Sequence, residues 1–481
     1  MEKNNQNMDI NSKISLVLSK IIDEKTYSFI MQELFCYEIG KPLKFIDSLN
    51  ILPKLNVQQL QNNFRKNIQK IISEIKNIIK TPYDDIYKVL SCIYGAFLGD
   101  AIGAFCEFEE PNKNNSKYIF RTDNTVIGGA PGQVTDDSEM ALSLAYAIMD
   151  NPIKDQLMPD YIYFYYGAWF NTQPLDFGNT TKNALELFDF FKFNPNLNNF
   201  KVIEPVINTS NNQSLSNGFL MRKCTFIAWL YYRFYNEINT AFNVIDNHNN
   251  NIALLNLYKK IKNLSYADNK CTNPNYLTNT ISSIYSLMAL MAIKGKDSHY
   301  ILNNIVNLVK EPNFINIGKD EQFIYKEILY YINLFSKKPD LYKIFGDISS
   351  QESVFNNMGF CLHSFKLTLY FLYNFDNIGH NNKYRTIMEQ ICDLGGDTDT
   401  NCCIVGAVIG PLIGMGNFGN EFNKMIELIP PNRAIYSVSM ILLFIIYLKK
   451  SNKDENLVKD DKYFLKQILT MLYGNVDTNL I

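Results

Sequence analysis

The stretch GAFLGDAIG, residues 95–103, decides how the fold of this chain is interpreted. Its glycines, Gly95, Gly99 and Gly103, recur every four residues and therefore share one face of a predicted helix. A glycine inside a helix costs up to about 1 kcal/mol relative to alanine. Three of them on one face indicate that another backbone or a ligand approaches this face closely. A helix predicted over residues 400–413 is again rich in small residues.

Apolar residues spaced three and four positions apart recur along most of the chain, whereas strict alternation is scarce, so we predict an all-α fold. The pattern predicts helices over residues 57–79, 138–150, 157–170, 180–192, 219–235, 277–294, 321–336, 357–375, 384–392, 400–413 and 462–473. The predicted organisation is an N-terminal helical accessory region (1–80), a compact multi-helix domain (83–450) and a C-terminal charged loop with a short helix (451–481). Asparagine runs such as Asn247–Asn251 are interpreted as codon bias and as solvated loops.

Charge and cysteine content exclude several classes of protein. Lys and Arg number 46 against 48 Asp and Glu, a net charge of −2, which disfavours a broad nucleic-acid footprint. The first residues lack the apolar stretch of a signal peptide, and the longest apolar run, 434–448, is shorter than the ~20 residues that cross a bilayer. Nine cysteines without a CxxC motif indicate neither a disulfide framework nor a zinc site. We expect a soluble, intracellular protein without membrane contact, and leave open export without a cleavable signal.

Two acidic clusters, GQVTDDSE (132–139) and GGDTDT (395–400), each precede an apolar helix. One interpretation is helix capping, because Thr, Asp and Ser are favoured N-caps and Asp136 with Glu139 fits a capping box. However, a cap needs one side chain, and carboxylates this close repel unless a cation lies among them. The clusters together offer at least four carboxylates and two threonine hydroxyls, with Glu107 as a further oxygen donor. Such ligands suit Mg²⁺ or Mn²⁺, or Ca²⁺, rather than zinc.

Two further motifs open helices. DFGNTT (176–181) is either a turn with a threonine cap or part of a site. SNGFLMR (216–222) begins with a tight-turn dipeptide, and the helix that follows would offer free backbone N–H groups to a phosphate. Arg222 would strengthen phosphate binding there, although a single arginine is more often a surface or ion-pair residue.

In this order, the motifs resemble the ADP-ribosylglycohydrolase family. The matching stretches are GAFLGDAIGAFCEF (95–108), GQVTDDSEMALSLA (132–145), FGNTTKNAL (177–185), SNGFLMR (216–222) and LGGDTDTNCCIVGAVIG (394–410). The resemblance extends from about Tyr83 to Phe418. The FGNTT stretch is most similar to the branch typified by the dinitrogenase-reductase-activating glycohydrolase, which acts on ADP-ribosyl-arginine.

The resemblance implies a two-metal centre, with two Mg²⁺ and Mn²⁺ as the alternative, and a binding cleft for ADP-ribose. The implied metal ligands are Thr135, Asp136, Asp137, Asp397, Asp399 and Thr400, with Glu107 at or next to the metals. The implied substrate-binding residues are Asp176, Gly178, Asn179, Ser216, Asn217, Gly218, Met221 and Arg222. Family members usually carry a Thr-His pair whose His lies near the substrate. Here the counterpart is Thr272-Asn273, so an asparagine replaces that histidine. Residues 1–80 and 300–356 are additions or divergent insertions.

We therefore expect a hydrolase that removes ADP-ribose from modified protein side chains, with arginine as the first choice of linkage. Asp136 and Asp137 are the first candidates for the general base, followed by Glu107 and Asp176. The alternative substrates are ADP-ribosyl-serine, O-acetyl-ADP-ribose and ADP-ribosylated nucleic acid, the last disfavoured by the charge balance. A non-catalytic ADP-ribose-binding or structural relative and a general two-metal phosphohydrolase are the rival classes.

Overall fold

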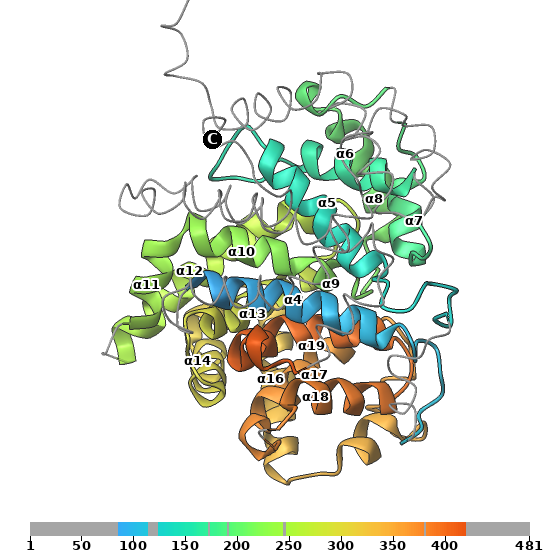
Figure 1. Cartoon of the computed structure of the whole chain (residues 1–481). Coiled ribbons are helices and arrows are strands. Elements are labelled where there is room, and N and C mark those ends of the chain that lie inside the picture. Colours follow the sequence, from blue (N-terminus) through green and yellow to red (C-terminus); the bar gives the residue numbers. More distant parts are fainter. Residues whose placement is uncertain are drawn as a thin grey trace, which may run out of the picture.

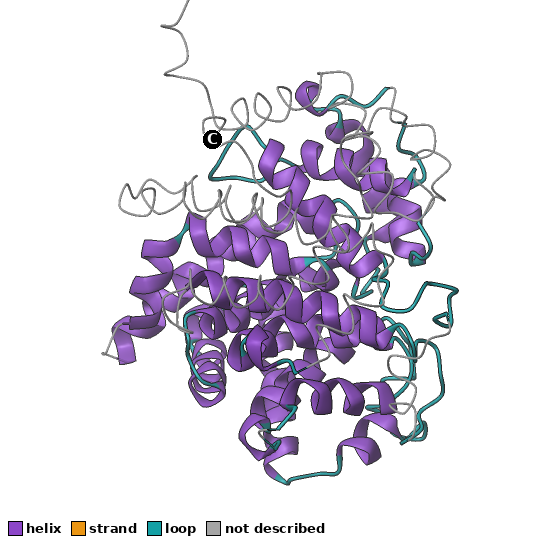
Figure 2. Cartoon of the chain, in the orientation of Figure 1, coloured by secondary structure: helices purple, strands orange, loops and turns teal. Residues whose placement is uncertain are grey.

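The computed structural model describes residues 85–113, 124–171, 174–189, 192–243, 247–379 and 381–419, and across these ranges it is helical with no strand (Figure 2). The longer helices are α4 (Asp85–Gly103), α5 (Asp136–Asp150), α6 (Pro159–Phe170), α8 (Phe200–Asn211), α10 (Lys223–Arg233), α11 (Tyr235–Asn243), α12 (Asn247–Asn269), α13 (Tyr276–Ile293), α14 (Ser298–Lys310), α16 (Lys319–Ser336), α17 (Cys361–Tyr373), α18 (Lys383–Asp393) and α19 (Thr398–Ile413). Short helices are α7 (Asn179–Leu185), α9 (Gly218–Met221), α15 (Pro312–Ile315), η2 (Pro195–Leu197), η3 (Tyr342–Gly346), η4 (Phe375–Asn377) and η5 (Met415–Asn417). The all-α prediction is confirmed. The accessory region 1–80, the apolar run 434–448 and the helices predicted over 57–79 and 462–473 lie outside the described residues.

Helices α4 and α19 lie side by side at the centre of the molecule, although they are the first and last long helices of the described chain (Figure 1). The glycine face of α4 is the reason. A Cβ atom at Gly95, Gly99 or Gly103 would overlap the backbone of α19, at Gly406, Cys402 and Thr398 respectively. The close backbone approach that the glycine spacing predicts is thus confirmed, and it comes from a second helix.

Several helix boundaries differ from the prediction. Helix α7 ends at Leu185, so the predicted helix 180–192 is too long. The predicted helix 219–235 is divided at Arg222 into α9 and α10. The solvated loop expected at Asn247–Asn251 is wrong, because these residues form the first turns of α12. Asparagine has low helix propensity, but α12 buries apolar residues further along, and this packing decides the outcome.

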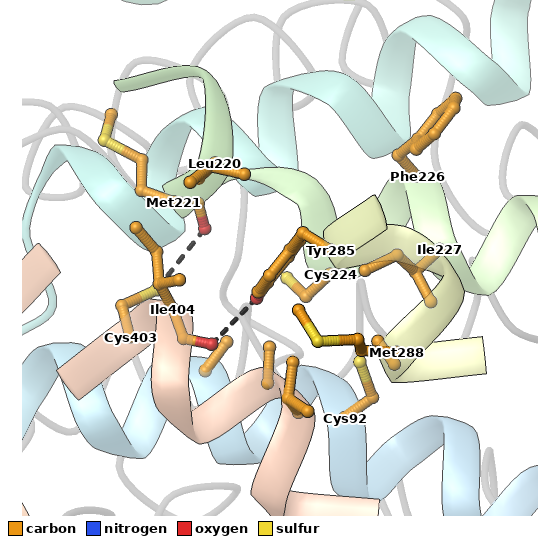
Figure 3. Close-up of a cluster of buried hydrophobic side chains, with 14 of the residues drawn as sticks. Cys92, Leu220, Met221, Cys224, Phe226, Ile227, Tyr285, Met288, Cys403 and Ile404 are labelled. Atoms are coloured by element: carbon orange, nitrogen blue, oxygen red, sulfur yellow. Dashed lines mark hydrogen bonds between the residues drawn. The ribbon is translucent and has the colours of Figure 1, made fainter. Parts of the chain in front are cut away.

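An apolar cluster fills the space between α4, α10, α13 and α19, with Met221 of α9 at its edge (Figure 3). Two hydrogen bonds tie its elements together: the Tyr285 hydroxyl donates to the Ile404 carbonyl oxygen at 2.8 Å, and the Cys403 thiol donates to the Met221 carbonyl oxygen at 3.3 Å. The eight described cysteines are free and buried, as expected from the sequence.

The described chain holds two helices long and apolar enough to cross a bilayer, α4 and α13. Both are almost entirely buried inside the protein. A helix that is apolar on all sides and covered on all sides by other helices is typical of a protein core. The apolar character of α4 and α13 is therefore explained by their position in the core of the helical domain.

Candidate metal centre

The four motifs meet at one cavity of about 370 Å³ at the N-terminal ends of α5, α7, α9 and α19. The cavity is lined by Glu107, Phe108, Asp136, Asp176, Gly178, Asn179, Thr180, Thr181, Ser216, Asn217, Gly218, Met221, Met358, Gly359, Asp397, Asp399 and Thr400. Most of the site residues expected from the sequence are in this set. Three are not: Thr135 and Asp137 lie in the buried layer behind it, and Arg222 is discussed below. Met358 and Gly359 also line the cavity but belong to no motif in the sequence, so they were not predicted.

The N-terminus of α5 is not capped by its own residues. The Thr135 side chain makes no cap hydrogen bond, and the Glu139 carboxylate accepts from the Trp169 indole at 2.9 Å, so the capping-box interpretation is wrong. The cap comes from α4, because the buried Asp100 carboxylate accepts from the backbone N–H groups of Thr135 and Ser138, at 3.0 and 3.1 Å. Both hydroxyls also donate to Asp100.

This cap from another helix leaves Asp136 and Asp137 available for other partners. Asp100 is not among the site residues predicted from the sequence, although a lone carboxylate next to Gly99 in a helix of small residues is a usable signal. Helix α19 follows the same rule, since its N-cap residue Asp397 makes no side-chain cap hydrogen bond. The carboxylates of Asp136, Asp137 and Asp397 therefore do not serve as caps and remain for a ligand. In Asp399, one carboxylate oxygen accepts the Thr400 backbone N–H at 2.8 Å, within the first turn of α19.

The two acidic clusters face each other across the start of α5 and α19. The Thr400 hydroxyl of α19 donates to Asp137 at 3.1 Å, and the Thr135 hydroxyl lies 3.2 Å from an Asp399 carboxylate oxygen. Two groups of carboxylates have oxygen atoms within 4.8 Å of one another: Asp100, Asp137 and Asp399 form one, and Glu107, Asp176 and Asp399 form the other. Asp399 belongs to both groups and thus lies at the centre of the acidic site.

The donor set fits a hard divalent cation. One carboxylate oxygen of Asp137 and one of Glu107 are buried without a hydrogen-bond partner among the described residues. A buried polar atom without a partner is costly, and a cation would satisfy it. Burial and the neighbouring carboxylates raise the pKa of Asp137 and Asp399 well above the usual range. Burial, with the charges of Asp176 and Asp397, raises the pKa of Glu107 to about 9.

These pKa shifts predict how metal-free protein responds to pH. A carboxyl group with a raised pKa binds more protons in the folded than in the unfolded state, so the free energy of unfolding falls as pH rises. The loss starts near the usual carboxyl pKa of about 4. It continues through the pKa of about 6 to which burial raises Asp100 and through that of Glu107, about 9. We expect the thermal midpoint in EDTA to fall between pH 5 and pH 9.

Bound Mg²⁺ would neutralise the cluster, so its stabilising effect should be larger at pH 8 than at pH 5.5. Thermal unfolding with EDTA and with excess Mg²⁺, at both pH values, measures this difference. Equal midpoints with and without Mg²⁺ at pH 8 would contradict a cation site. At each pH, the midpoint in EDTA is subtracted from the midpoint in Mg²⁺. This subtraction cancels the contribution of titratable groups elsewhere in the chain, which is the same in both conditions.

The other side of the cavity is built from neutral residues. The Asn217 side-chain amide donates to the Asp397 carboxylate at 2.6 Å, which joins the SNG segment to the acidic cluster. The Asn217 backbone N–H donates to the Gly359 carbonyl oxygen at 2.8 Å. Gly178 has no atom within 4 Å of a Cβ built on it, so this position is open toward the cavity.

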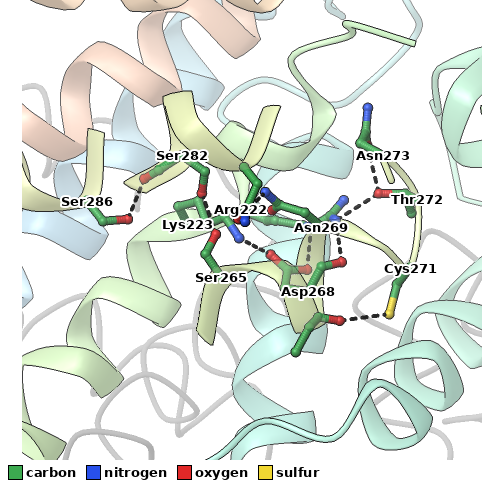
Figure 4. A network of polar contacts seen from close by, with 12 residues as sticks. Arg222, Lys223, Ser265, Asp268, Asn269, Cys271, Thr272, Asn273, Ser282 and Ser286 are labelled. Atoms are coloured by element: carbon green, nitrogen blue, oxygen red, sulfur yellow. Dashed lines mark hydrogen bonds and ion pairs between the residues drawn. The ribbon is translucent and has the colours of Figure 1, made fainter. Parts of the chain in front are cut away.

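Arg222 does not reach the cavity, contrary to the expectation of a phosphate contact. Its side chain is fully buried and binds Asp268 with its Nε atom at 3.0 Å (Figure 4). Lys223 is bound to the same carboxylate, and the Tyr166 hydroxyl donates to it at 2.6 Å. Arg222 also donates to the Gly218 carbonyl oxygen at 2.9 Å. It therefore supports the SNG segment from behind, as the ion-pair interpretation of a lone arginine predicts.

The family model described as ADP-ribosylglycohydrolase matches residues 81–426. A protein of Acanthamoeba polyphaga mimivirus, provisionally named an ADP-ribosyl glycohydrolase, is 27% identical over 337 residues, 67% of this chain and 86% of that protein. The ADP-ribosyl-dinitrogen reductase glycohydrolase of Rhodospirillum rubrum is 30% identical over 104 residues, 21% of this chain and 34% of that enzyme. A solved chain of an ADP-ribosylglycohydrolase-related protein complex covers 76% of this chain and 98% of its own length, with 18% identity and a TM-score of 0.47. The family match spans all of the residues that the structure describes.

Proposed function

Because the chain belongs to the ADP-ribosylglycohydrolase family, we propose that it is a metal-dependent hydrolase that releases ADP-ribose from modified arginine side chains of proteins. The observation that carries the metal dependence is the pair of carboxylate groups that share Asp399. The arginine linkage is supported by the resemblance of the FGNTT stretch to the dinitrogenase-reductase-activating branch. The partners are then ADP-ribose and an ADP-ribosylated protein.

The proposed cofactor is a pair of Mg²⁺ ions, with Mn²⁺ as the alternative. The residues proposed to hold them are Thr135, Asp136, Asp137, Asp397, Asp399 and Thr400, with Glu107 next to them. All are oxygen donors, which Mg²⁺ prefers. The chemistry that Mg²⁺ supplies when bound is Lewis acidity, which orients the ribose hydroxyls and makes a water more acidic.

The reaction breaks the bond between ribose C1 and the modified side chain, and positive charge develops on the ribose in the transition state. Five acidic residues line the cavity, Glu107, Asp136, Asp176, Asp397 and Asp399, and those that are ionised would stabilise this charge. A base must also accept the proton of the attacking water. We assign this role to Asp136, because it lines the cavity and Asp137 does not, and keep Asp137 as a ligand. Glu107 and Asp176 are the candidates for protonating the leaving group.

A release assay tests the proposal. Proteins or peptides carrying ADP-ribose on arginine or serine, ADP-ribosylated nucleic acid and O-acetyl-ADP-ribose are offered with Mg²⁺ or with EDTA. We expect release from the arginine substrate with Mg²⁺ and loss of release in EDTA. Release only from another substrate would replace the arginine assignment.

Calorimetry with ADP-ribose separates the rival classes. Binding of ADP-ribose with Mg²⁺, but no release from any substrate, would identify a binding module instead of an enzyme. Phosphate release from simple esters would identify a phosphohydrolase. Release that is equally fast in EDTA would contradict the metal dependence.

A further inference from the structure

A chain of hydrogen bonds leads from the buried Asp268 carboxylate to Ser216 in the wall of the cavity, and Figure 4 shows its part from Asp268 to Asn273. Asp268 binds Arg222, and the Arg222 Nη2 donates to the Thr272 hydroxyl at 2.8 Å. The Thr272 hydroxyl donates to the Asn273 Oδ1 at 2.8 Å, and the Asn273 Nδ2 donates to the Ser216 hydroxyl at 2.9 Å. The first four residues are at most 1% exposed, whereas Ser216 is half-buried and lines the cavity.

The direction of this chain is set at both ends. A guanidinium group only donates hydrogen bonds, so the Thr272 oxygen accepts from Arg222 and its single proton goes to the Asn273 Oδ1. The Asn273 amide nitrogen must then face Ser216. It also lies 3.4 Å from the Ser216 backbone carbonyl oxygen, which can only accept. The Arg222 guanidinium, which only donates, and the Ser216 carbonyl oxygen, which only accepts, therefore require the same orientation of the Asn273 amide between them.

The direction matters for Ser216. Its hydroxyl oxygen accepts from Asn273, and among the described residues no group accepts the hydroxyl proton. We propose that Asn273 is a positioning residue that fixes the Ser216 hydroxyl as a hydrogen-bond donor into the cavity, for an anionic oxygen of the bound ADP-ribose. Such oxygens only accept, whereas water and ribose hydroxyls can do both. The inference rests on the proposed function, because it takes ADP-ribose as the ligand.

The substitution Asn273→Asp tests the direction at nearly constant shape. Thr272 can still donate to the new carboxylate, but the carboxylate accepts where the amide donated, so it takes the Ser216 proton away from the cavity. We expect the affinity for ADP-ribose, measured by calorimetry with Mg²⁺, to fall about tenfold, the size of one charge-assisted hydrogen bond. In turnover the loss should appear in KM, with kcat nearly unchanged.

A double-mutant cycle shows whether the effect passes through Ser216. Ser216→Ala alone should also lower the affinity about tenfold. In the Ser216→Ala background, Asn273→Asp should change it by less than about twofold, since the group it acts on is gone. Additive losses would overturn the proposal. If the buried carboxylate prevents folding, Asn273→Ala removes the donor without adding a charge, and the same non-additivity is expected.

Asn275→Asp is the matched control. It introduces the same charge two residues away, where the side chain caps α13 outside the cavity lining, and should leave the affinity unchanged. Wild-type protein that binds ADP-ribose, with variants that bind equally well, overturns the positioning role and leaves the proposed function standing. Wild-type protein that does not bind ADP-ribose overturns both.

Discussion

Replacing Asp399 with asparagine is expected to lower the rate of ADP-ribose release by about a thousandfold, about 4 kcal/mol of transition-state stabilisation. Asp399 is the one carboxylate that belongs to both acidic groups, so the substitution weakens every cation position that the site offers. The measurement is kcat/KM for the arginine-linked substrate at saturating Mg²⁺.

The same substitution should not harm the fold. Burial and the charges of Glu107, Asp137 and Asp397 raise the pKa of Asp399, which means that the metal-free protein gains by losing this charge. We therefore expect an unchanged or higher thermal midpoint in EDTA, together with a smaller stabilisation by Mg²⁺. In a site where like charges repel one another without the ligand, removing one charge often raises stability and lowers activity.

Asp376→Asn is the matched control for Asp399→Asn. It makes the same chemical change at a side chain that is 65% exposed and lies outside the cavity lining. Its kcat/KM should equal that of the wild type. Turnover of Asp399→Asn within tenfold of the wild type would remove Asp399 from the metal centre.

Gly99→Ala is expected to destabilise the fold by about 3 kcal/mol. On an open helix face the same change would stabilise by up to about 1 kcal/mol, because alanine is the better helix former. Here the new Cβ would overlap the Cys402 carbonyl carbon and oxygen, which are backbone atoms and cannot rotate away. The two central helices must separate, and Asp399 lies one turn before Cys402 on α19. A fall of about 5 °C in the thermal midpoint, with reduced Mg²⁺ binding, is the expected result.

Gly379→Ala is the control for this prediction. Gly379 is exposed, and a Cβ built on it meets no atom within 4 Å. Its substitution should leave the free energy of unfolding within about 0.5 kcal/mol of the wild type, as for most surface changes. If Gly99→Ala is as stable as the wild type, Gly99 is not required for the close packing of α4 against α19.

Much of the fold and of the candidate site could be predicted from local patterns. Helical periodicity is repeated within each helix, so the all-α class and most of the long helices followed from it. The glycine spacing of α4 predicted a close backbone contact, and the structure supplies α19. The helices α8, α11, α12 and α14 were not predicted. In α14 the signal was present, since Ile301, Ile305 and Leu308 follow helical spacing and are buried on one face. In α12 the asparagine-rich start weakens the local pattern, and burial of apolar residues further along decides the fold.

The sequence by itself determined the kinds of groups this protein uses: small residues on one helix face, and acidic and hydroxyl residues at the starts of two helices. These are local properties, readable within one or two helical turns. Only the tertiary structure decided their partners. It assigned the cap of α5 to Asp100, directed Glu139 to Trp169, and placed Arg222 behind the cavity wall on Asp268. A buried polar group must find a partner somewhere, but which one it finds depends on helices far apart in the chain, and no local pattern records that choice.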